Sequence, residues 1–159
     1  MQLPLTDLQK SGALVSGGSA PTKSIQGCMG QPLFNGVVEM TLLSAGVKDG
    51  KYIISFKVAN GAQKNLLPPS DAGVNYDYMF AASADGQVAQ FDTWDAANSP
   101  NRSITPGANL TANFVLNTPP SFEVARILYR PGDSKLKDGR ANGLNFVPVS
   151  NMEFALKCK

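Results

Sequence analysis

The sequence contains no histidine, the side chain most often used as a general base and as a metal ligand. Without histidine, the chain cannot form the Ser–His or Cys–His pair that activates a nucleophile. Zinc would have to be held by two cysteines and carboxylates, which is an uncommon ligand set. We therefore expect a protein that is not an enzyme and that uses no metal and no other cofactor.

Strong charge and long apolar runs are absent as well. The formal net charge is +2, and lysine and arginine do not gather in one dense run. No aromatic residues are interleaved with basic ones as in an RNA-binding sheet, so we expect no nucleic-acid partner. No segment is apolar over the ~20 residues of a membrane helix. Polar residues follow Met1 at once, so no signal peptide is visible.

The chain has only two cysteines, Cys28 and Cys158, near the two ends of the expected domain. In an exported protein, such a pair predicts one disulfide. In a cytosolic protein, the same residues would be two buried free thiols. We expect the disulfide, and with it a secreted or periplasmic protein in which Met1 replaces a removed leader.

Apolar and polar residues alternate in many segments of the sequence. In residues 51–60, Tyr52, Ile54, Phe56 and Val58 fall on one side, which predicts a half-buried strand. The Asp49–Gly50 pair before it favours a tight turn. Further strands are predicted within residues 38–42, 76–82, 88–94, 109–116, 122–130, 144–149 and 151–158.

About seven or eight short strands separated by turn signals predict an all-β protein, an immunoglobulin-like antiparallel two-sheet sandwich. A closed barrel is the alternative, because sequence does not fix strand order. Residues 61–74 and 131–143 are predicted to be loops, and no helical periodicity is present from residue 34 onward. Residues 1–33 are rich in Gly, Ser, Thr, Pro and Gln, which predicts an ordered but irregular arm before a sandwich at 34–159.

Within residues 35–130, the segments YIISFKVANGAQKNL, YDYMFAASADGQ and SITPGANLTANFVLNTP occur in that order. This arrangement resembles bacterial exported immunoglobulin-like domains of unknown function, including lipoprotein-borne ones, and is similar in outline to a small secreted mycobacterial antigen. The positions that carry the resemblance are Val58, Asn60, Asp85, Gly86, Pro106, Gly107, Phe114 and Pro119. The resemblance implies that these residues make the fold and have no catalytic role.

Trp94 lies between Asp92 and Asp95 in a polar stretch, which makes these three residues candidates for a binding site. A lone tryptophan in such a place stacks on a sugar, anchors a protein partner, or covers the open end of the core. Between Asn65 and Asn101 there are five aspartates and no lysine or arginine. Their spacing matches no calcium-binding loop, so we expect no metal site.

Arg126 and Arg130 are the other candidates, in a basic segment toward the end of the chain. In immunoglobulin-like sandwiches, the strands that would carry Asp77 and Arg126 usually share a sheet. This predicts a cross-strand Asp77–Arg126 ion pair. The alternative is a polar recognition face that includes Arg130.

Taken together, these features predict a non-catalytic exported binding module. Its expected partner is another protein in the bacterial envelope or outside the cell. One alternative is a structural or accessory subunit of a surface assembly, with the N-terminal arm donating contacts to a neighbour. Further alternatives are a carbohydrate-binding module, through Trp94, and a protease inhibitor, through the loop around Tyr129–Gly132.

Overall fold

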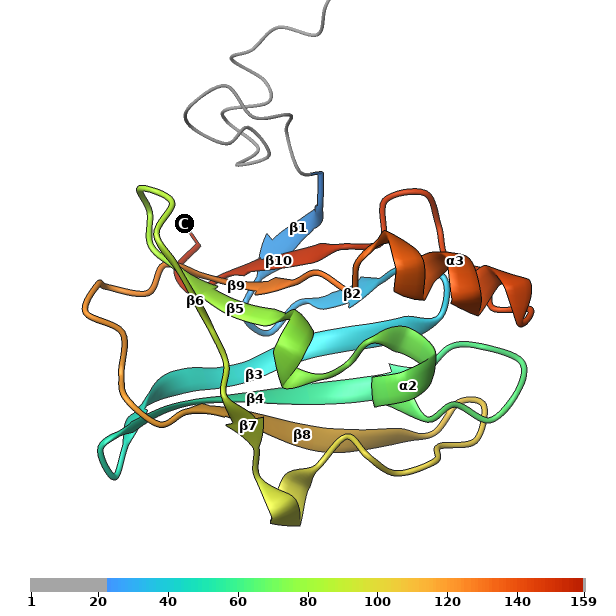
Figure 1. The fold of residues 1–159 in the computed structure, drawn as a ribbon, viewed down its shortest axis with the longest axis horizontal. Coiled ribbons are helices and arrows are strands. Elements are labelled where there is room, and N and C mark those ends of the chain that lie inside the picture. The colour runs from blue at the N-terminus through green and yellow to red at the C-terminus, as the bar shows by residue number, and fades with distance from the viewer. Residues whose placement is uncertain (1–22, 159) are drawn as a thin grey trace, which may run out of the picture.

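The computed structural model describes residues 23–158, and two five-stranded sheets in it lie face to face (Figure 1). Sheet A has the strand order β1-β10-β9-β5-β6, and sheet B the order β2-β3-β4-β8-β7. The predicted all-β sandwich of two sheets is therefore confirmed. The first 22 residues of the predicted arm lie outside the described residues.

Sheet A consists of β1 (Ile25–Cys28), β10 (Met152–Ala155), β9 (Arg126–Tyr129), β5 (Met79–Ala82) and β6 (Val88–Gln90). Sheet B consists of β2 (Pro32–Phe34), β3 (Val38–Lys48), β4 (Lys51–Asn60), β8 (Asn109–Leu116) and β7 (Thr93–Trp94). The connections contain the helices α2 (Pro68–Ala72) and α3 (Asp133–Ala141) and the 3₁₀ turns η1 (Tyr76–Tyr78) and η2 (Ala96–Asn98).

The longest pairing in the molecule is the β3–β4 hairpin. Its turn residues, Asp49 and Gly50, have φ angles of 53° and 77°, the left-handed conformation that two-residue hairpin turns require. Leu42 pairs with Phe56 but Ser44 pairs with Ser55, so Leu43 is the extra residue of a β-bulge. The hairpin tip and the helices α2 and α3 lie at opposite ends of the sandwich (Figure 1).

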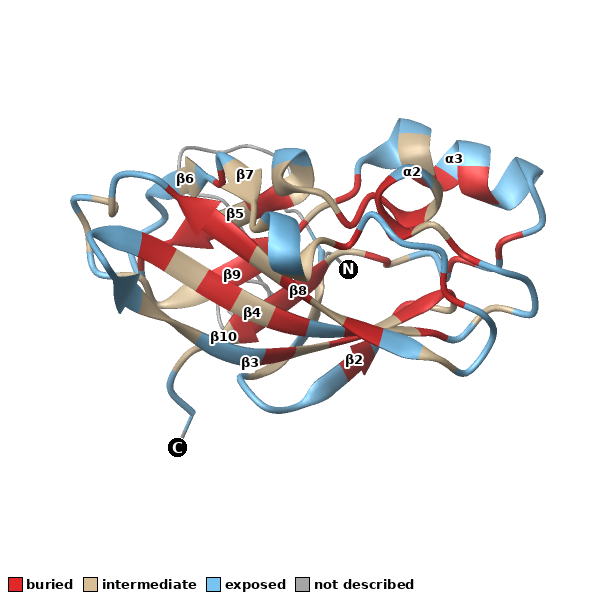
Figure 2. Cartoon of the chain, turned by 90° about the horizontal axis from the view of Figure 1, so that it is seen from below, coloured by how far each residue is buried: buried red, intermediate tan, exposed pale blue. Residues whose placement is uncertain are grey.

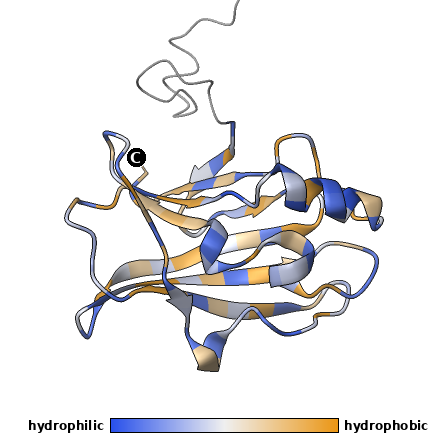
Figure 3. Cartoon of the chain, in the orientation of Figure 1, coloured by the Kyte–Doolittle hydropathy of each residue, from blue (hydrophilic) through white to orange (hydrophobic). Residues whose placement is uncertain are grey.

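The core lies between the sheets and centres on Phe56. Its ring is 6.4 Å from that of Phe114 in the same sheet and 5.1 Å from that of Phe154 in the opposite sheet. All three side chains are fully buried or nearly so, as the alternation predicted for Phe56 and Phe114. The same alternation appears as bands of burial along β4 in Figure 2 and as bands of hydropathy along the strands in Figure 3.

The sandwich begins earlier in the chain than residue 34, where its boundary was predicted. β1 pairs in parallel with β10 at the edge of sheet A, and β2 is the edge strand of sheet B. Cys28 and Cys158 form a disulfide across 130 residues of sequence, with Cα atoms 6.0 Å apart. In the chain-entropy account, closing so long a loop contributes about 4–5 kcal/mol. The disulfide holds β1 in place although the composition of this segment resembles a linker.

Helix α3 contradicts the prediction of a loop at residues 131–143. The segment contains a single large apolar residue that is buried, Leu136, so no helical periodicity was visible. Gly139 is a buried residue of this helix. A Cβ atom there would lie 2.4 Å from the Phe146 ring, so the glycine serves close packing.

The sequence places Tyr76, Tyr78, Phe80 and Ala82 on one side of a strand at residues 76–82, but the structure follows a different phase. Tyr76 and Tyr78 lie in η1, and the strand starts at Met79. Met79 and Ala81 are therefore the buried core residues, while Phe80 is half-buried. The turn shifts the register by one residue, which exchanges the two faces of the strand.

Candidate functional site

The structure places the predicted site residues in two separate regions. Asp92, Trp94 and Asp95 lie in and around β7, at the edge of sheet B. Arg126 begins β9 and Arg130 follows it, in sheet A. The two groups lie on different layers of the sandwich, so they do not form one site.

We call the outward side of sheet A, with Gln26, Arg126, Leu128 and Glu153, face A. The outward side of sheet B, with Ser55, Lys57, Thr111, Asn113 and Val115, is face B.

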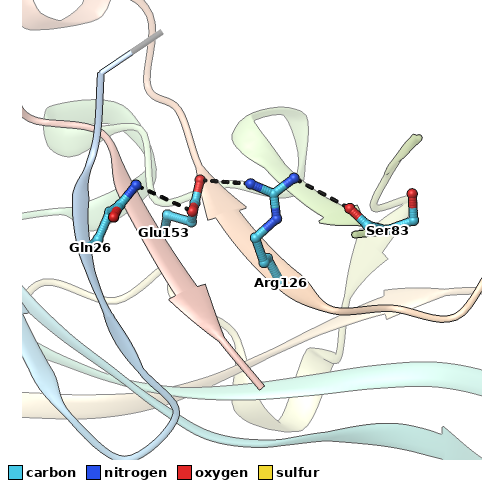
Figure 4. A network of polar contacts seen from close by, with 4 residues as sticks. All are labelled: Gln26, Ser83, Arg126 and Glu153. Carbon is cyan, nitrogen blue, oxygen red and sulfur yellow. Dashed lines mark hydrogen bonds and ion pairs between the residues drawn. The ribbon is translucent and has the colours of Figure 1, made fainter. Parts of the chain in front are cut away.

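Face A carries a line of polar contacts that crosses its strands (Figure 4). Arg126 on β9 donates from Nη1 to Glu153 Oε1 on β10 at 3.2 Å and from Nη2 to the Ser83 carbonyl oxygen at 3.3 Å. Gln26 on β1 donates from Nε2 to the other carboxylate oxygen of Glu153 at 3.5 Å. The network therefore ties β1, β10, β9 and the end of β5 together.

The predicted Asp77–Arg126 ion pair is wrong. β5 and β9 are antiparallel, with Met79 opposite Tyr129 and Ala82 opposite Arg126. Asp77 precedes Met79, so it lies at the other end of this pairing from Arg126. The partner of Arg126 is Glu153. In the sequence, Glu153 stood opposite the apolar set of its strand, but nothing indicated which arginine would face it.

Burial controls the electrostatics of face A. Only 9% of the Glu153 side chain is exposed, and burial raises the pKa of its carboxyl group, opposed by the charge and the hydrogen bond of Arg126. Burial also lowers the pKa of Arg130. Among residues 23–158, the Nε atoms of Arg126 and Arg130 have no hydrogen-bond acceptor. Gln26, Arg126, Glu153 and the Ser83 carbonyl nevertheless bond to one another within the chain.

Face B is hollowed by a groove of about 800 Å³ beside the β3–β4 hairpin tip. Its floor contains Ile53 of β4 and Val115 of β8, which are paired to each other and belong to the outward side of the sheet. Along the other edge of β4, Ile53 pairs with Gly46 of β3. No atom lies within 4 Å of the place where a Gly46 Cβ would be, so the missing side chain leaves space for the groove.

Neutral polar groups lie beside this apolar floor. Ser55 and Asn113 are paired across β4 and β8, and both line the groove. The Oδ1 atom of Asn113 is buried and has no hydrogen-bond donor among the described residues. An amide side chain can both donate and accept hydrogen bonds, so Asn113 offers a polar group to a ligand in the groove.

Charged side chains lie at the rim of the groove. Lys48, Asp49 and Lys51 belong to the hairpin tip, whereas Asp95 follows β7 at the far edge of the sheet. None of these four makes an ion pair in residues 23–158. The hairpin side therefore carries two positive charges and one negative, and the β7 side carries one negative charge.

Trp94 reaches the groove but is already engaged elsewhere. It pairs with the buried Phe114 and packs against the core, with its ring 5.3 Å from that of Tyr76 at 69°. This edge-to-face pair covers the open edge of the sandwich, which was the alternative to a binding role.

The two aspartates beside Trp94 also shape the chain locally. Asp92 accepts a hydrogen bond from the Asn117 amide at 2.8 Å, and Asp95 accepts one from the Ala97 amide at 3.1 Å at the start of η2. One carboxylate therefore fixes the end of β8, and the other begins the turn that forms a wall of the groove.

The described part of the chain shows neither a cluster of metal ligands nor a membrane-spanning helix. No group of three or more Cys, Asp or Glu residues within 23–158 is placed to hold a metal ion. No helix in this range has the length and apolar character needed to cross a membrane.

Comparison with known proteins is informative about the fold alone. No family model matches the chain, and no curated protein matches it. A secreted protein of Mycobacterium tuberculosis, MPT63, has a similar structure, with a TM-score of 0.55, 12% identity, and coverage of 84% of this chain and 98% of that one.

Two further solved structures are similar. An uncharacterised β-sandwich protein from Clostridium difficile has a TM-score of 0.53 and 12% identity over 89% of this chain and all of that one. The yjhA protein of Bacillus subtilis has a TM-score of 0.52 and 10% identity over 84% and 99%. At these identities the likeness shows that this chain shares their fold, a β-sandwich also found in a secreted bacterial protein.

Proposed function

We propose that the protein is a non-catalytic exported binding module whose recognition site is the groove of face B. Its partner is another protein in the envelope or outside the cell, and a part of that protein enters the groove. The observation that carries the proposal is the groove itself, in which the apolar Ile53 and Val115 lie beside the polar Ser55 and Asn113. A volume of about 800 Å³ lies within the range of ligand sites, roughly 300–1,000 Å³.

Export is supported by two observations. Intrachain disulfides persist in oxidising compartments, and this one spans almost the whole described chain. A structurally similar protein is secreted. Both fit a secreted or periplasmic location and membership in the exported immunoglobulin-like group suggested by the sequence.

Site-specific cross-linking tests the proposal. A photoreactive amino acid replaces Val47, which lines the groove and is 64% exposed, or Val88 on β6 of sheet A, which is 53% exposed and serves as the matched control. Each variant is irradiated with surface proteins of the producing cell. We expect one protein adduct from position 47 that position 88 does not give, and we expect Gly46→Val in the same chain to abolish it.

Gly46→Val suits this purpose because its added side chain enters open space and β-branched residues favour strands. Unchanged circular dichroism and melting temperature would show that the variant is folded. Adducts that are equal at positions 47 and 88, or that persist in Gly46→Val, would contradict the groove as the site. The absence of any adduct would contradict a protein partner.

A further inference from the structure

We infer that the groove of face B binds a short peptide segment with one aliphatic side chain, flanked by an acidic residue toward the hairpin and a basic residue toward β7. This inference rests on the proposed function and names the chemistry of the partner. It combines four features of the groove: an apolar floor, an amide side chain, separated rim charges, and a tryptophan that packs against the core.

The apolar floor selects the central side chain. Ile53 and Val115 lie side by side on an outward face whose other central positions are polar, such as Ser55, Lys57 and Thr111. The open space opposite Ile53, where Gly46 has no side chain, has room for added methyl groups. An aliphatic side chain placed there would be removed from water, which favours binding in proportion to the area buried.

The amide of Asn113 favours a peptide backbone. Asn113 lies two residues before Val115 on β8, at the next outward position, and it lines the groove. A peptide whose side chain rests on the floor formed by Ile53 and Val115 carries main-chain N–H and C=O groups next to it. The Asn113 side chain can hydrogen-bond to either group.

The rim charges select the flanking residues and their order. Lys48 and Lys51 at the hairpin tip outnumber Asp49, so this side attracts an acidic residue. Asp95 is the only charged lining residue on the β7 side, so that side attracts a basic one. Exposed pairs of this kind contribute modestly to affinity and fix the direction in which a ligand binds.

The packing of Trp94 leaves less of its ring for a sugar. Trp94 is half-buried, with its ring edge-to-face with Tyr76 and against the core. A neutral saccharide would also leave the rim charges unused. The features of the groove therefore favour a peptide over a carbohydrate.

Selection from a random linear peptide library displayed on phage tests the inference with the full chain. We expect enriched peptides to contain an aliphatic residue between an acidic and a basic one. Synthetic copies should bind Gly46→Val at least about tenfold more weakly than the parent chain. They should bind Asp95→Asn and Lys51→Gln about two- to fivefold more weakly, the range of a lost exposed charge pair. Asp95→Asn keeps an oxygen that can accept from the Ala97 amide.

Thr111→Val is the control, because Thr111 lies on face B outside the groove. We expect this variant to bind the peptides with unchanged affinity. Enriched peptides that lack the charge pattern, or that bind Gly46→Val as well as the parent chain, would overturn the inference.

An array of neutral oligosaccharides, probed with the same proteins, distinguishes failure of the peptide inference from failure of the groove as the recognition site. Saccharide binding that Gly46→Val abolishes, without peptide binding, would overturn the peptide inference and the protein partner but leave the groove as the site. Peptide binding that every groove variant retains would overturn the groove itself.

Discussion

The two outward faces of the sandwich use polar side chains in different ways. On face A, Glu153 receives hydrogen bonds from Arg126 and Gln26, and Arg126 also reaches the Ser83 carbonyl. On face B, the Asn113 side chain has a buried oxygen with no donor in the described chain, and the charges at the rim are unpaired. The outward positions of both sheets include polar residues. Those of face A hydrogen-bond to one another across strands, whereas those of face B line a groove.

This difference separates polar residues that stabilise a sheet from polar residues that are left to bind a ligand. Groups that satisfy each other across strands hold those strands in register, and their loss should appear as a loss of stability. Groups with no partner in the chain have no bond to lose on substitution, so their loss should appear mainly in binding. Arg126 and Asp95 were both candidate binding residues, and the structure assigns Arg126 to a network that links strands of sheet A.

The largest expected loss of stability comes from removing the disulfide that holds β1 at the edge of sheet A. Replacing both Cys28 and Cys158 with serine should lower the free energy of unfolding by about 2–5 kcal/mol, because the unfolded chain gains freedom. Denaturant unfolding monitored by circular dichroism would measure this change. Binding of groove peptides by the folded variant should be unchanged, since the groove belongs to sheet B. Equal midpoints for the two proteins would mean that β1 is held by other contacts.

A smaller effect should follow from removing the guanidinium of face A. Arg126→Ala leaves Glu153 buried with only the Gln26 contact, so we expect a loss of about 1–3 kcal/mol in the free energy of unfolding. Lys57→Ala on face B, where the lysine is exposed, should stay within about 0.5 kcal/mol of the parent. Comparable losses in the two variants would remove the distinction between the faces.

The pH dependence of stability should also differ between the faces. Because burial raises the pKa of Glu153 above its ordinary value of 4.5, the folded chain binds this proton more readily than the unfolded chain does. The parent should therefore lose stability as pH rises from 4.5 through the folded pKa. Glu153→Gln lacks this loss, so the variant should gain stability relative to the parent as pH rises above 4.5.

Unfolding free energies at several pH values would test this expectation. Glu39→Gln on face B, where Glu39 lies on the outward side of β3, controls for the loss of one carboxylate. A difference between Glu153→Gln and the parent that does not vary with pH would contradict the role of burial at Glu153.

The smallest effect on stability should come from Asn113→Ala on face B. Because its Oδ1 atom has no donor to lose, the free energy of unfolding should change by no more than about 0.5 kcal/mol. Affinity for a groove peptide should fall by about two- to tenfold, as expected for one hydrogen bond. Titration calorimetry and thermal unfolding of the same sample would measure both. A large loss of stability without a loss of binding would place Asn113 with the structural residues.

Much of the fold could be predicted because its signals are local. The alternation in residues 51–60 and 109–116 gave the two central strands of sheet B with their buried sides correct. The Asp49–Gly50 turn followed from the conformations that these residues tolerate. The Cys28–Cys158 disulfide followed from the number and placement of the cysteines.

The errors arose where packing between distant segments decides the structure. Leu136 is too little apolar signal for a helix, and the packing of Gly139 against Phe146 is visible only once the chain is folded. The partner of Arg126 depends on the register between strands that are separated in sequence. The groove depends on Gly46 and on the β8 pairing, so no local pattern could reveal it. Trp94 and Asp95, candidates from the sequence, line the groove, but its floor and Asn113 were missed.

The disulfide also determines how the domain bears mechanical load. A pulling force applied before Cys28 and after Cys158 passes directly from one sulfur to the other, because Cys28 and Cys158 are joined by the disulfide, with Cα atoms 6.0 Å apart. The segment between the two cysteines is bypassed, so tension does not unravel β3, β4 or β8. A chain anchored at one end and pulled at the other would keep the shape of its groove up to forces that break a covalent bond.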